Sequence, residues 1–104
     1  MKSYKLKLYI AGKTARASHA IANLRRICDE ELSDQFKLEI IDILEDPDRA
    51  EEDKILATPT LIKSLPPPLR RVIGDLSDTE KVLFGLDIIP AGGTPPGTLP
   101  GDRP

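Results

Sequence analysis

Hydrophobic and polar residues alternate along residues 4–10, where every second side chain from Tyr4 onward is apolar. This period of two is typical of a β-strand that is buried on one face. From Ser18 onward the apolar residues recur mostly at intervals of three and four, which predicts an amphipathic helix. These residues are Ile21, Leu24, Ile27, Cys28 and Leu32.

Residues 37–44 form the second predicted strand, in which alternation gives way to an almost continuous apolar run. Such a run is typical of an inner strand of a parallel sheet. Asp46 and Pro47 then occupy the N-cap and the first position of a short polar helix. A strand, a crossover helix and a second strand at this spacing predict a right-handed parallel unit.

Two more apolar runs, residues 57–65 and 69–73, lie on either side of three consecutive prolines and predict a pair of strands. Ser77 and Glu80 have the spacing of a capping box, in which two side chains satisfy free backbone N–H groups where a helix begins. The predicted order of elements is therefore βαβαββα, an α/β fold.

Residues 90–104 differ in composition, because Pro and Gly recur there and only Ala91 and Leu99 are apolar. Such a segment cannot bury enough apolar surface to offset the entropy lost on ordering. We therefore predict one folded domain over residues 1–89 and a disordered Gly/Pro-rich tail over residues 90–104.

Composition excludes several classes of protein. The 104 residues carry a formal net charge of −2, which gives no sign of the basic face that nucleic acid binders use. The alternating N-terminus lacks the apolar stretch of a signal peptide, and no run approaches membrane-spanning length. We expect a cytoplasmic protein that binds neither nucleic acid nor membranes.

Pro59 lies at the start of the third predicted strand, within residues 57–61 (ATPTL). Proline cannot donate to a ladder, so within sheets it is confined to such positions, to edges or to bulges. The arrangement resembles the cis-proline corner of thioredoxin-like folds, whose neighbouring loop faces the active-site cysteines. The matching turn here, residues 11–18, contains no cysteine. We therefore expect a thioredoxin-like plan that serves binding rather than catalysis.

Other candidates for chemistry are weak. A thiol–disulfide enzyme needs a Cys-X-X-Cys turn at a helix N-terminus, whereas the single cysteine, Cys28, lies mid-helix on the apolar stripe and is interpreted as core. His19 is the single histidine, which is too few for a zinc site, and no triad assembles around it. The acidic residues of 45–53 lack EF-hand spacing and are interpreted as a solvated helix face. We expect no cofactor and no metal.

Longer runs of sequence identify a protein family more specifically than these single residues do. The chain resembles the KaiB family over about residues 4–89, most clearly in residues 50–61 (AEEDKILATPTL) and 65–77 (LPPPLRRVIGDLS). The resemblance implies two folds, a thioredoxin-like monomer and a βαββααβ homotetramer in which the second half of the chain is refolded. Mass action favours the oligomer at high concentration, so we expect the isolated protein to be the homotetramer.

The resemblance also implies partners. The thioredoxin-like monomer of the family binds the hexameric ATPase KaiC, and that complex captures KaiA and competes with the sensor kinase SasA. We therefore expect a non-enzymatic protein that regulates a circadian or timing system by switching fold, with a SasA-like kinase as a further partner. A thioredoxin-like interaction module in stress response, without clock partners, is the alternative.

Position by position, the resemblance places four basic residues on the partner-facing surface: Lys54, Lys63, Arg70 and Arg71. Gly85 and Asp87 match the pair that biases the family's fold equilibrium. Replacing Gly85 by Ala should favour the helical form by about 1 kcal/mol. Four prolines add to the case for two states, because a cis X-Pro bond costs only about 0.5–1 kcal/mol, although they could also simply end strands. They are Pro59, Pro66, Pro67 and Pro68.

Two departures from the family affect the expected partners. Glu39 stands where cyanobacterial members usually carry a lysine, on the surface that meets KaiA, and Pro90 replaces an aromatic residue before a tail of altered composition. A charge reversal at a binding edge is costly when the partner is unchanged. We therefore expect that KaiA is not captured, and that the chain comes from a non-cyanobacterial relative.

Overall fold

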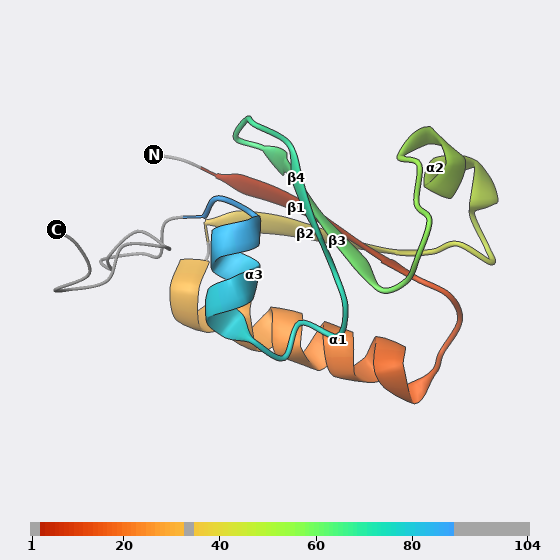
Figure 1. Cartoon of the computed structure of the whole chain (residues 1–104), viewed down its shortest axis with the longest axis horizontal. Coiled ribbons are helices and arrows are strands. Elements are labelled where there is room, and N and C mark those ends of the chain that lie inside the picture. The colour runs from red at the N-terminus through yellow and green to blue at the C-terminus, as the bar shows by residue number, and fades with distance from the viewer. Residues whose placement is uncertain (1–2, 33–34, 89–104) are drawn as a thin grey trace, which may run out of the picture.

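The computed structural model describes residues 3–32 and 35–88, and its strands and helices follow the order βαβαββα (Figure 1). The strands are β1 (Tyr4–Ile10), β2 (Phe36–Asp42), β3 (Thr60–Leu65) and β4 (Arg70–Ile73). The helices are α1 (Ala15–Ile27), its π-helical continuation η1 (Cys28–Leu32), α2 (Pro47–Glu52) and α3 (Thr79–Gly85). The predicted α/β order is confirmed. The predicted tail, residues 90–104, lies outside the described residues, and the βαββααβ homotetramer stays a prediction.

Within the described residues, four strands form one sheet in the order β2-β1-β3-β4. β1 and β2 are parallel, β3 is antiparallel to β1, and β4 is antiparallel to β3. β2 is therefore an edge strand, and its interpretation as an inner strand is wrong. It ends at Asp42, so the apolar residues that follow, Ile43 and Leu44, lie outside the strand, although the Ile43 N–H still donates to the Ile10 carbonyl at 2.8 Å.

Helices cover the two faces of the sheet unequally (Figure 1). α1 and α3 pack on one face, over a large apolar cluster that includes Leu6 and Leu8 of β1. α2 lies on the other face, over a smaller cluster made of Tyr9, Ile41 and Ile62. Because strand side chains alternate between faces, β1 contributes to both clusters.

The start of α1 differs from the prediction. The helix begins at Ala15 rather than at Ser18, because Thr14 is its N-cap. The Thr14 hydroxyl accepts a hydrogen bond from the Ala17 N–H at 3.0 Å. A hydroxyl cap of this kind satisfies one of the free N–H groups in the first turn.

The capping box predicted for the last helix is also wrong. α3 has Asp78 as its N-cap, and the Asp78 carboxylate accepts from the Lys81 N–H at 3.2 Å. The Ser77 N–H instead donates to the Asp75 carboxylate at 3.1 Å. Ser and Asp are equally good caps, so the sequence left the start of this helix open by one residue.

Candidate partner-binding surface

α2 ends in a Schellman turn, in which Lys54 is the residue after the C-cap. Lys54 has a φ of 54°, in the left-handed region that glycine usually occupies at this position. The Lys54 N–H donates to the Glu51 carbonyl at 3.1 Å, and the Ile55 N–H donates to the Ala50 carbonyl at 2.9 Å. The chain therefore turns sharply at Lys54, whose side chain is exposed.

Arg71 of β4 contacts this turn. Its Nη1 atom donates to the Lys54 carbonyl at 3.3 Å, and Arg71 is itself exposed. The structure thus brings together two of the predicted contact residues, which are 17 positions apart in the sequence. They form one basic site, the Lys54–Arg71 pair.

Arg70 and Lys63 do not join this pair. Neighbouring residues of a strand point to opposite faces, so Arg70 lies on the face of β4 away from Arg71. Arg70 is exposed and lines a hollow together with Gly85 and Asp87. Lys63, its cross-strand neighbour, is only 1% exposed. The predicted surface therefore divides in two, and Lys63 is not on the surface in this conformation.

Beneath the Lys54–Arg71 pair, Asp53 is tied to β1. The Lys7 Nζ atom donates to the Asp53 carboxylate at 2.8 Å, and the Tyr9 hydroxyl donates to the same carboxylate oxygen. The Tyr9 side chain is fully buried. Asp53 was interpreted from the sequence as part of a solvated acidic face, which is wrong, because its side chain is only 23% exposed and anchors α2 to the sheet.

This contact shifts two pKa values. Burial, together with the hydrogen bond to the Asp53 carboxylate, raises the pKa of Tyr9. Partial burial also opposes ionisation of Asp53, but the hydrogen bonds from Lys7 and Tyr9 outweigh it and lower the pKa of that carboxyl. Tyr9 therefore stays protonated as a donor and Asp53 stays ionised as an acceptor at neutral pH.

Glu39, at the position where the family resemblance leads us to expect a lysine, pairs with α2. Arg49 donates through Nη2 to Glu39 Oε1 at 2.8 Å, and Nη1 contacts the other carboxylate oxygen. The hydrogen bond to Arg49 lowers the pKa of Glu39. The altered charge at this position is therefore matched by a cation within the same chain.

α3 ends in a second Schellman turn, with Asp87 at a φ of 58°. The Asp87 N–H donates to the Phe84 carbonyl at 3.1 Å, and the Ile88 N–H donates to the Leu83 carbonyl at 3.0 Å. Gly85, in the last turn of α3, lies against β4. A Cβ atom built at this glycine would be 2.7 Å from the Val72 Cγ2 atom.

The structure confirms the cis-proline corner. The Thr58–Pro59 bond is cis, and the Pro59 carbonyl accepts from the Gly74 N–H at 3.0 Å. In the connection between β3 and β4, the Leu65–Pro66 and Pro67–Pro68 bonds are also cis. The part that these prolines play in a change of fold stays a prediction.

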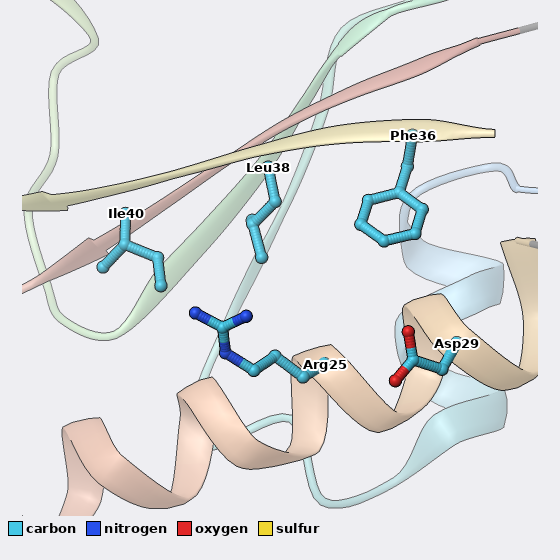
Figure 2. Close-up of a pocket in the computed structure, with 5 residues that line it drawn as sticks. All are labelled: Arg25, Asp29, Phe36, Leu38 and Ile40. Carbon is cyan, nitrogen blue, oxygen red and sulfur yellow. The ribbon is translucent and has the colours of Figure 1, made fainter. Parts of the chain in front are cut away.

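A groove runs between α1 and the edge strand β2 (Figure 2). Phe36, Leu38 and Ile40 point from β2 toward α1, and Arg25 of α1 and Asp29 of η1 point back (Figure 2). One guanidinium and one carboxylate beside apolar side chains provide no nucleophile paired with a base. The groove therefore offers contact surface and lacks a catalytic constellation.

The structure also gives positions to the other residues that were considered for chemistry. Cys28 is fully buried in the larger cluster, and burial raises the pKa of its thiol to about 12. His19 is exposed on α1. Over residues 3–32 and 35–88, no group of three or more His, Cys, Asp or Glu side chains could hold a metal ion.

Four residues that support this surface were not predicted from the sequence: Lys7, Tyr9, Arg49 and Asp53. Lys7 and Tyr9 are the polar-face residues of β1, and they indicated only that one face of the strand was less apolar. Their partners follow them by more than 40 positions. No local pattern links them.

Among solved structures, the N-terminal domain of SasA from Synechococcus elongatus has a similar fold. It matches with a TM-score of 0.66 and 18% identity, over 79% of this chain and 77% of that one. Mitochondrial thioredoxin 3 from Saccharomyces cerevisiae matches with a TM-score of 0.66 and 17% identity, over 83% and 78% of the two chains. At these identities the likeness shows a thioredoxin-like fold.

Sequence relatives are much closer. The circadian clock protein KaiB3 of Synechocystis sp. is 66% identical over 87 residues, which cover 84% of this chain and 85% of the relative. The circadian clock oscillator protein KaiB of Microcystis aeruginosa is 57% identical over 88 residues, or 85% of each chain. The KaiB domain model matches residues 7–88. The chain therefore belongs to the KaiB family.

Proposed function

We propose that this protein is a non-enzymatic regulator that binds a KaiC-type hexameric ATPase and modulates a circadian or other timing system. The observation that carries the proposal is the 66% identity with a clock protein, KaiB3. The exposed Lys54–Arg71 pair supports it, because complementary charge steers association and suppresses wrong partners.

The proposal includes a change of fold between this thioredoxin-like monomer and a βαββααβ homotetramer. The monomer is the binding-competent state, so its population scales the apparent affinity for the ring. Gly85 and Asp87 lie at the end of α3, where the helical form must end in a residue at positive φ. Their position at this turn supports a role in setting the equilibrium, with the prolines at 59 and 66–68 as neighbouring constraints.

One further partner follows from the same proposal. The SasA N-terminal domain has the same fold, so a SasA-like sensor kinase is proposed to compete for the ring. Capture of KaiA is not proposed, because Glu39 brings a negative charge to β2 and is already engaged by Arg49. That the chain comes from a non-cyanobacterial relative stays a prediction.

The described part of the chain, residues 3–32 and 35–88, has no helix of the length and apolarity that membrane crossing requires. We propose that the protein acts in the cytoplasm, without a cofactor and without binding nucleic acid.

Binding to a cognate KaiC homologue tests the function. Wild-type protein should bind the immobilised hexamer, and Arg71→Ala should weaken binding by about tenfold, as expected for a contact arginine. Lys37→Ala, which removes an exposed lysine on β2, is the matched control and should bind like the wild type. If the wild type binds no KaiC homologue, the stress-response module replaces the clock regulator.

A further inference from the structure

Leu56 lies two residues after Lys54 and is 96% exposed. A single exposed leucine is ordinary on a protein surface. Leu56 is unusual because the backbone that leads to it is held from several sides, and because Lys54, whose carbonyl accepts from Arg71, lies only two residues before it.

Three successive residues before Leu56 are fixed by different elements. The Asp53 side chain accepts from Lys7 and Tyr9 of β1. The Lys54 carbonyl accepts from Arg71 of β4. Ile55 donates its N–H back into α2, and its side chain packs on the smaller apolar cluster.

Tyr9 is the centre of this support. Its ring is fully buried in the smaller cluster, so the position of its hydroxyl is set by the sheet. That hydroxyl donates to Asp53 and also lies 3.2 Å from the Arg49 carbonyl of α2. One side chain of β1 therefore holds both the last turn of α2 and the residue that precedes Lys54.

We propose that residues 53–56 are a preformed contact, in which Leu56 enters an apolar pocket of a protein partner and the Lys54–Arg71 pair faces carboxylates at the rim. Lys7, Tyr9 and Asp53 are its positioning residues. The inference rests on the proposed function, since the partner is the ring ATPase. Protein interfaces combine an apolar core with a polar rim, and a contact ordered before binding loses less entropy.

The contact is tested by Leu56→Ala in the ring-binding experiment. We expect Kd to rise about tenfold, because most of the apolar surface that Leu56 buries on binding is lost. Leu44→Ala is the matched control, because Leu44 is 71% exposed and lies outside residues 53–56. If the wild type binds and Leu56→Ala binds equally well, this inference fails while the proposed function stands. If the wild type does not bind, both fail.

The positioning is tested without any partner, by limited trypsin digestion after Lys54. Tyr9→Phe keeps the ring and removes the hydroxyl, so cleavage after Lys54 should become about tenfold faster, as expected when a hydrogen bond to a charged group is lost. Ile62→Val is the control, because it thins the same cluster without touching Asp53.

Both variants should lower Tm. Only Tyr9→Phe should make the peptide bond after Lys54 easier to cleave and weaken binding to the ring ATPase. Equal cleavage in Tyr9→Phe and the wild type would overturn the positioning role. So would equal acceleration in Ile62→Val, because the effect would then reflect general loss of stability.

Discussion

The ends of α2 and α3 share one backbone geometry and differ in how it is held. Both close in Schellman turns around a non-glycine residue at positive φ, Lys54 at 54° and Asp87 at 58°. At α2, side chains of β1 and β4 hold the turn through Asp53 and the Lys54 carbonyl. At α3, the last turn approaches the sheet through a glycine that leaves room for Val72.

The difference separates two ways of specifying a turn. The α2 end is fixed by long-range polar contacts, so its shape is insensitive to the residue at the turn itself. The α3 end depends on local choices, a small residue in the last turn and a residue that tolerates positive φ. We therefore expect the loss of a distant partner to matter most at α2, and the size of the residue in the last turn to matter most at α3.

Removal of Asp53 should have the largest effect. Asp53→Ala deletes an acceptor of two hydrogen bonds and leaves the buried Tyr9 hydroxyl with one fewer partner, so unfolding free energy should fall by about 3 kcal/mol. Urea unfolding measures it. Asp48→Ala, on the same helix, removes an exposed carboxylate and should change stability by less than about 0.5 kcal/mol.

The same site has a defined pH dependence. Because the pKa of Asp53 is lowered in the folded state, its stabilisation is present above the ordinary carboxyl pKa of about 4 and is lost as pH falls through the folded value. The stability difference between the wild type and Asp53→Asn should therefore shrink in acid. A difference that stays constant through the acid range would contradict the ion pair.

Gly85→Ala should have the next largest effect. Alanine is more favourable than glycine inside a helix by about 1 kcal/mol, so helix propensity alone predicts a gain in stability. The 2.7 Å approach of the new Cβ to Val72 opposes that gain, and overpacking of this kind costs about 1–3 kcal/mol. We expect net destabilisation in thermal unfolding that disappears in the Val72→Ala background. A stabilised Gly85→Ala with Val72 intact would contradict this account.

Glycine at the two turn residues should have a smaller effect of the opposite sign. An ordinary L-residue pays about 1–2 kcal/mol in the left-handed region, so Lys54→Gly should raise Tm slightly. Asp87→Gly should gain less, because aspartate tolerates this region better than lysine does. The reverse order of the two gains would show that the supports at α2 already remove the strain at Lys54.

The Glu39–Arg49 pair should have the smallest effect. Its side chains are 50% and 33% exposed, so Glu39→Gln should cost less than about 1 kcal/mol, and the cost should fall as salt is added. In an Arg49→Gln background the same substitution should be neutral. A cost that persists there would assign Glu39 another partner.

Periodicity along the chain was enough to predict the element order, because alternation in β1 and the helical stripe of α1 are local signals. Periodicity did not identify β2 as an edge strand. The apolar residues of β2 that face α1 give this strand the composition of an inner one. Nor could periodicity separate Asp53 from Asp48, which look alike within one acidic run. Their roles differ because Tyr9 and Lys7 reach only one of them.

Only part of the candidate site could be predicted from the sequence, because the rest depends on contacts between residues that are far apart in the chain. The four basic positions come from family resemblance, but their grouping depends on strand geometry, which places Arg71 beside Lys54 and turns Arg70 away. The burial of Lys63 follows from its place opposite Leu6, on the face of the sheet that carries the larger apolar cluster. The Val72 contact of Gly85 is likewise invisible in a local pattern.

The hydrogen bond of Tyr9 affects the ultraviolet absorbance and the fluorescence of the protein. The chain has no tryptophan and only two tyrosines, and the Tyr9 phenol donates a hydrogen bond to an ionised carboxylate at the end of α2. A phenol in such a contact ionises at higher pH than an ordinary one and has an altered near-ultraviolet spectrum. Any motion that carries α2 off the sheet would therefore change the tyrosine absorbance and emission of the unlabelled protein.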